Sequence, residues 1–136
     1  MKLCGIPMRA MANDPPILVI EDNDVVAQLV SAVLRGDGVE VLIAPNGYTG
    51  LDLFEQHRPR IMILDLAISG PNSIEVLRTV HGSILGNKLS VICIVMSGEA
   101  EHEFQARKLG VVEFLHEPFE PADLHSVVQR TNRSAA

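Results

Sequence analysis

Short runs of apolar residues alternate along the chain with longer segments whose apolar residues recur at the spacing of one helix face. An unbroken apolar run is typical of a strand buried on both sides, and such runs occupy residues 17–20, 39–43, 61–64, 91–96 and 111–115. The segments between and after these runs predict helices that begin near Val25, Gly47, Ile74, Glu99 and Pro121. The alternation predicts a doubly wound α/β domain, in which helices cover both faces of a five-stranded parallel sheet.

Glycine and proline mark several of the predicted boundaries. Gly36 and Gly38 end the first helix, and Pro59 ends the second strand-helix unit. Pro118 ends the fifth strand, because proline has no N–H to donate to a sheet. Pro121 suits the first turn of the last helix, where an N–H has no helical partner.

Length and composition indicate a single domain. The 136 residues, 47% of them hydrophobic, are enough for one packed core, which we expect over residues 15–132. We expect residues 1–14 to form a flexible extension and residues 133–136 a tail. No apolar run approaches the roughly 20 residues that cross a bilayer, and the first residues do not resemble an export signal. Cys4 and Cys93 are expected to be free thiols, which indicates a reducing compartment. Together with the short apolar runs, this predicts a soluble, cytoplasmic protein.

Charge and motifs exclude several function classes. The formal charge of -6 arises from 17 acidic and 11 basic residues, and no basic cluster is present that could follow a nucleic-acid backbone. A nucleophile elbow, a glycine-rich phosphate loop and a CxxC pair are also absent from the sequence, so we do not expect an enzyme. Four dispersed histidines lack metal-ligand spacing and are expected at the surface: His57, His81, His102 and His125.

Acidic residues follow the first and third predicted strands. Glu21 and Asp22 come directly after one apolar run and Asp65 after another, while Ser97 follows the fourth. Ligands of open parallel sheets bind at the carboxyl ends of the strands, so these side chains are expected to meet. Close carboxylates repel by about 4 kcal/mol per pair at an effective dielectric constant of roughly 20, which favours a hard divalent cation such as Mg²⁺. Alternatively, acids after strands serve as helix caps, and Asp22 can begin the first helix.

The strings ILVIEDND, IMILDLAISGPNSIEVLR, VMSGEAE and VVEFLHEPFEPADL resemble the receiver domain of two-component response regulators, over about residues 17–130. The resemblance implies a sheet in the order 2-1-3-4-5 and an Asp65 that accepts a phosphoryl group from a histidine kinase or phosphotransfer protein. It implies Mg²⁺ ligation by Glu21, Asp22, Asp65 and the backbone carbonyl of Ala67. It also assigns Ser97 as the switch hydroxyl and Phe114 as the rotating aromatic.

The chain departs from the family pattern at the position before Pro118. The family has a lysine there that pairs with the acceptor aspartate, whereas this chain has Glu117. The exchange loses an attraction and adds a repulsion, each on the order of 1 to 4 kcal/mol at a partly solvated site. His116 can replace the missing cation only if the strand has already ended, because successive strand side chains point to opposite faces.

A second departure lies in the loop after Asp65. Ile68 and Ser69 stand where the family commonly has Met-Pro, and Ser73 stands in place of a glycine. A changed loop path would weaken Mg²⁺ binding, because the carbonyl of Ala67 must point at the metal.

Three functions remain open. The first is a stand-alone phosphoacceptor that relays its state to another protein through the predicted helix at 99–109, the fifth strand and the last helix. The second is a divergent receiver that binds a protein independently of phosphorylation. The third, a small phosphotransfer enzyme, is disfavoured because no residues for a second substrate pocket are evident.

Overall fold

The computed structural model describes residues 15–68, 72–82, 89–95 and 99–135, and the expected extension at residues 1–14 lies outside them. Strands and helices alternate throughout: β1 (Ile17–Ile20), α2 (Asp24–Gly36), β2 (Val41–Ala44), α3 (Gly47–His57), β3 (Ile61–Asp65), α4 (Ser73–His81), β4 (Ser90–Val95), α5 (Ala100–Lys108), β5 (Glu113–His116) and α6 (Pro121–Ala135). The last helix therefore extends into the segment expected to be a tail. None of the helices in these ranges has the length and hydrophobicity needed to cross a membrane.

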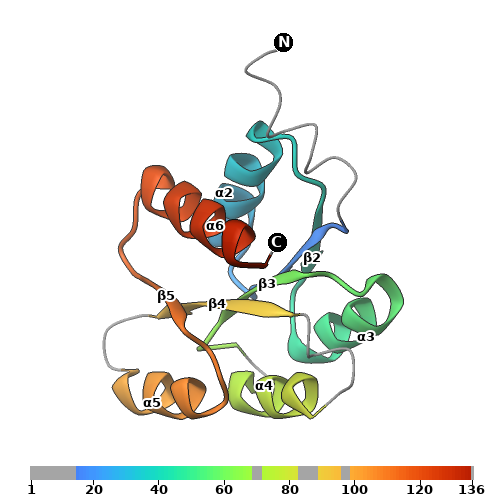
Figure 1. Ribbon diagram of the computed structural model, residues 1–136, viewed down its shortest axis with the longest axis vertical. Helices are drawn as coiled ribbons and strands as arrows, with labels where there is room; N and C mark the ends of the chain where they lie inside the picture. Colours follow the sequence, from blue (N-terminus) through green and yellow to red (C-terminus); the bar gives the residue numbers. More distant parts are fainter. Residues whose placement is uncertain (1–14, 69–71, 83–88, 96–98, 136) are drawn as a thin grey trace.

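The five strands form one parallel sheet in the order β2-β1-β3-β4-β5, which confirms the predicted fold and strand order. Figure 1 shows α2 and α6 on one face of this sheet and α3, α4 and α5 on the other. The doubly wound arrangement places the carboxyl ends of β1 and β3 side by side, with Ile20 paired to Leu64.

The sheet is buried on both faces, as the unbroken apolar runs predict. Along β1, Leu18 and Ile20 join the core under α3 and α4, while Ile17 and Val19 join the core under α2 and α6. Leu64 in β3 is 0% exposed. Each such side chain contributes about 1.5–3 kcal/mol through burial, and the residues at the strand ends follow directly from this packed core.

Two strands begin later than the sequence predicts. The runs at 39–43 and 111–115 predict strands that start two residues earlier than β2 and β5 do. The amide of Val39 donates instead to the carbonyl of Leu34, and the amide of Val111 donates to the carbonyl of Ala106. Both valines are buried but belong to the turns that close the preceding helices, because their N–H groups satisfy helix carbonyls rather than a neighbouring strand.

Helix α3 packs against β1 at a glycine. A Cβ atom at Gly50 would overlap the side chain of Ile20, which is fully buried. The absence of a side chain at Gly50 therefore allows the helix to approach the strand whose carboxyl end carries the acidic pair.

Candidate functional site

Three carboxylates meet where β1 and β3 end. Glu21 and Asp22 follow β1, and Asp65 is the last residue of β3. One oxygen from each of the three lies within 4.8 Å of the others. Glu21 and Asp65 are 3% and 5% exposed, while Asp22 is exposed, so the cluster has a buried floor and one open side.

The carboxyl group of Glu21 is buried and only partly hydrogen-bonded. Its Oε2 accepts a hydrogen bond from the amide of Asn23 at 3.2 Å, but its Oε1 is buried and has no hydrogen-bond partner. Burial raises the pKa of Glu21 from 4.5 to about 9, and the neighbouring Asp65 carboxylate contributes to the increase. A buried, unpartnered carboxylate oxygen beside two further carboxylates fits a hard cation that prefers oxygen ligands.

The cap of helix α2 is Asn23 rather than Asp22. Its Oδ1 accepts hydrogen bonds from the amides of Val25 and Val26 at 2.9 and 3.2 Å. The alternative in which Asp22 caps the first helix is therefore wrong, and the Asp22 carboxylate remains available to the cluster.

The chain directly after Asp65 is held by three hydrogen bonds. The amide of Leu66 donates to the carbonyl of Ile94 at 3.1 Å, and the amide of Ala67 donates to Asp65 Oδ1 at 3.0 Å. The hydroxyl of Ser73 donates to the carbonyl of Leu66 at 2.8 Å. Ser73, noted in the sequence only as standing in place of a glycine, thus contacts the backbone next to Asp65. Ile68 is buried, and Ser69 lies outside the described residues.

Glu117 directly follows β5 and lies close enough to Asp65 for their charges to interact. Its amide donates to the carbonyl of Val95 at 2.8 Å, and its peptide bond to Pro118 is cis. The pKa of Glu117 is raised, chiefly by burial and then by the negative charges of Asp65 and Glu99. The negative charge of Asp65 therefore acts on the carboxyl group that follows β5.

His116 points to another part of the molecule. Its Nε2 lies 3.0 Å from Oε1 of Glu103 on α5. Hydrogen bonds from His116 and Arg107 lower the pKa of Glu103. In this arrangement His116 pairs with Glu103, so it does not supply the cation beside Asp65 that the sequence left open.

Phe114 is half-buried on β5 under the guanidinium group of Arg107, whose Cζ lies 4.3 Å from the ring centroid. Arg107 is itself paired with Glu103 at 2.7 Å. The ring therefore lies beneath an ion pair on the face formed by α5 and β5. Ser97, the other half of the predicted switch, lies outside the described residues.

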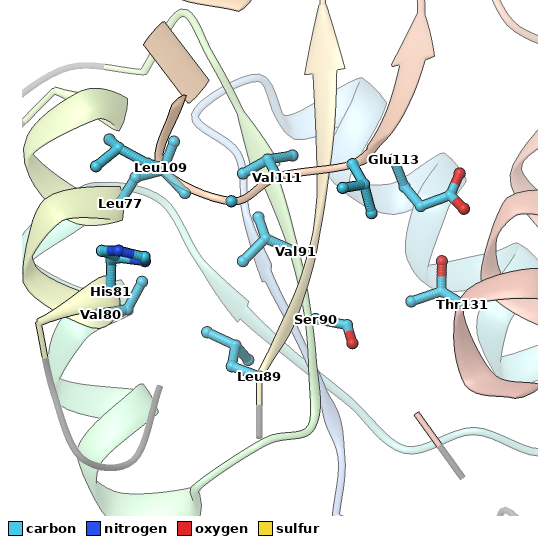
Figure 2. Close-up of a pocket in the computed structure, with 12 residues that line it drawn as sticks. Leu77, Val80, His81, Leu89, Ser90, Val91, Leu109, Val111, Glu113 and Thr131 are labelled. Carbon is cyan, nitrogen blue, oxygen red and sulfur yellow. The ribbon is translucent and has the colours of Figure 1, made fainter. Parts of the chain in front are cut away.

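A separate cavity of about 370 Å³ lies at the opposite end of the strands (Figure 2). Ser90 and Val91 at the start of β4 line it, together with Val111 before β5 and Val80 of α4. The carboxylate cluster lies at the carboxyl ends of the strands, so this cavity is not part of the acidic site.

Comparisons with known proteins agree with this arrangement. A family model described as the response regulator receiver domain matches residues 17–129. Sporulation initiation phosphotransferase F of Bacillus subtilis is 25% identical over 114 residues, which are 84% of this chain and 90% of that protein. The transcriptional regulatory protein CseB of Streptomyces avermitilis is 26% identical over 84% of this chain, which corresponds to 47% of that longer protein. A putative response regulator from Chloroflexus aurantiacus superposes with a TM-score of 0.81 at 26% identity, covering 88% of this chain and 98% of that one.

Proposed function

The chain belongs to the receiver-domain family of two-component response regulators, and from this membership we propose that Asp65 accepts a phosphoryl group from a histidine kinase or phosphotransfer protein. We further propose that the domain relays its phosphorylation state by binding another protein. The observation that supports the proposal is the placement of the buried Asp65 carboxylate within 4.8 Å of carboxylate oxygens from Glu21 and Asp22.

The donor set fits Mg²⁺. Glu21, Asp22 and Asp65 supply oxygen ligands only, and Glu21 Oε1 is buried without a partner. These three carboxylates and the backbone carbonyl of Ala67 would hold the ion. When bound, Mg²⁺ would neutralise negative charge on the transferring phosphoryl oxygens.

The protein's own residues supply the nucleophile and its orientation. A carboxylate oxygen of Asp65 would attack the phosphorus atom of a phosphohistidine, forming an acyl phosphate as the bond from phosphorus to nitrogen breaks. The amide of Ala67 binds Asp65 Oδ1 and restricts rotation of the carboxylate. Because Asp65 is buried, few orientations are open to it, and positioning rather than acid-base chemistry is the main contribution of the protein.

The readout would use the face formed by α5, β5 and α6. The new phosphoryl group would attract the hydroxyl of Ser97, which would let Phe114 move inward. Phe114 would then leave the guanidinium of Arg107, at a cost of about 0.5–1 kcal/mol for a cation-π contact near the surface. The pair between Arg107 and Glu103 would lose the ring beneath it, so the surface offered to a downstream protein would change.

Glu117 opposes this chemistry, because its carboxyl group adds negative charge beside Asp65. We therefore expect slower phosphorylation than a lysine at this position would give. The same charge is the observation that favours the second candidate, a receiver that binds its partner without phosphorylation.

Intact-mass measurement after incubation with Mg²⁺ and a small acyl phosphate separates the two candidates. We expect one added phosphoryl group on the parent protein, none on Asp65→Asn, and faster addition to Glu117→Lys. An adduct on Glu117→Lys but not on the parent would support phosphorylation-independent binding. No adduct on either protein would overturn the assignment of Asp65 as the acceptor.

A further inference from the structure

The peptide group between Leu66 and Ala67 is hydrogen-bonded at both of its polar atoms. Its N–H donates to Asp65 Oδ1 at 3.0 Å, and its carbonyl accepts from the hydroxyl of Ser73 at 2.8 Å. A trans peptide is planar, with its N–H and C=O pointing in opposite directions. Whatever fixes the carbonyl of Leu66 therefore also fixes the direction in which the amide of Ala67 points.

Ser73 is well placed to fix that carbonyl. It is the first residue of α4 and only 1% exposed. The preceding residue, Asn72, forms a capping box with Glu75: the amide of Glu75 donates to Asn72 Oδ1 at 3.0 Å, and the amide of Asn72 donates to Glu75 Oε1 at 3.4 Å. The capping box thus holds the start of the helix without help from the Ser73 side chain. The helix therefore fixes the position from which the Ser73 hydroxyl donates.

We propose that Ser73 is a positioning residue for the Asp65 carboxylate, acting through the peptide between Leu66 and Ala67. The hydroxyl holds this peptide so that its N–H binds one oxygen of Asp65, which leaves the other oxygen in one orientation. A glycine, which the family commonly has at this position, carries no hydroxyl and cannot make this contact. The inference rests on the proposed role of Asp65 as phosphoacceptor.

A purely structural role for Ser73 makes a different prediction. If the hydroxyl only satisfies a buried carbonyl, its removal will lower stability without changing the Ala67 amide selectively. The matched control is Asn72→Ala, which weakens the same helix start by removing the capping side chain but leaves the Ser73 hydroxyl in place.

The decisive measurement is hydrogen exchange of the Ala67 amide, followed by NMR in the protein without added phosphate donor. Ser73→Ala is expected to speed this exchange about tenfold or more relative to other amides of β3, because the amide loses its fixed direction. Asn72→Ala is expected to leave the relative exchange unchanged, and Ser73→Thr, which keeps a hydroxyl, is expected to restore protection. Unchanged exchange in Ser73→Ala would overturn the proposal, whatever the phosphorylation result.

The second readout is the rate of acyl-phosphate formation at saturating Mg²⁺. We expect Ser73→Ala to be slower by about tenfold and Asn72→Ala to match the parent, since misplacement of a nucleophile costs rate directly. Equal slowing in both variants would overturn the positioning role. If neither the parent nor Glu117→Lys forms an adduct, the assignment of Asp65 fails, while the exchange measurement still decides whether Ser73 orients the peptide.

Discussion

Without divalent cations, a rise in pH from 6 to 9 should destabilise the fold through Glu21. The pKa of this buried carboxyl group is 4.5 in the unfolded reference and about 9 in the folded protein. Between these values the folded protein holds a proton that the unfolded chain has released. The stability contributed by this proton is fully present below pH 4.5 and is lost as the pH rises through about 9.

The loss can be estimated from the same two values. Each pH unit in this window changes the free energy of unfolding by up to about 1.4 kcal/mol, so three units remove at most about 4 kcal/mol. For a domain of this size, that loss lowers Tm by on the order of 10 °C. The pKa of Glu117 is also raised, so deprotonation of this group likewise destabilises the fold.

The assay is urea unfolding from pH 6 to 9, with a chelator and with saturating Mg²⁺. Mg²⁺ is expected to remove most of the pH dependence, because the cation takes the place of the proton on Glu21. Glu21→Gln is the control, since it removes the titrating group and leaves all five histidines in place. Equal stability of the metal-free parent at both ends of the range, or full pH dependence in Glu21→Gln, would refute this role of Glu21.

Two further predictions concern the support beneath the site, and denaturant unfolding checks both. Gly50→Ala should destabilise the protein by about 1–3 kcal/mol, because the added methyl group overlaps Ile20. Ile20→Val should then destabilise the Gly50→Ala protein less than it destabilises the parent. Additive effects of the two substitutions would contradict this contact. Leu64→Ala should cost about 2–5 kcal/mol because the side chain is 0% exposed, and a cost below 1 kcal/mol would show that this part of the core is loosely packed.

Much of the fold could be predicted from the sequence, because unbroken apolar runs and helical periodicity are local properties. The run ending at Leu64 indicated a strand buried on both faces, and the residue after it had to lie where that strand emerges. The boundaries near Val39 and Val111 could not be predicted in this way. Both residues are apolar and buried like strand residues, but their amides bind helix carbonyls, and a hydrophobic pattern contains no information on hydrogen-bond partners.

For the site, the sequence determined which residue types lie at the strand ends, including the acid at position 117. The tertiary structure decided which partners these residues have: His116 pairs with Glu103, Asn23 caps α2, and the Ser73 hydroxyl donates to the carbonyl of Leu66. The contacts made by His116 and Ser73 join residues that are 13 and 7 positions from their partners. Such contacts depend on where α4 and α5 pack against the sheet. That placement is set by packing of the whole domain, and no local pattern specifies it.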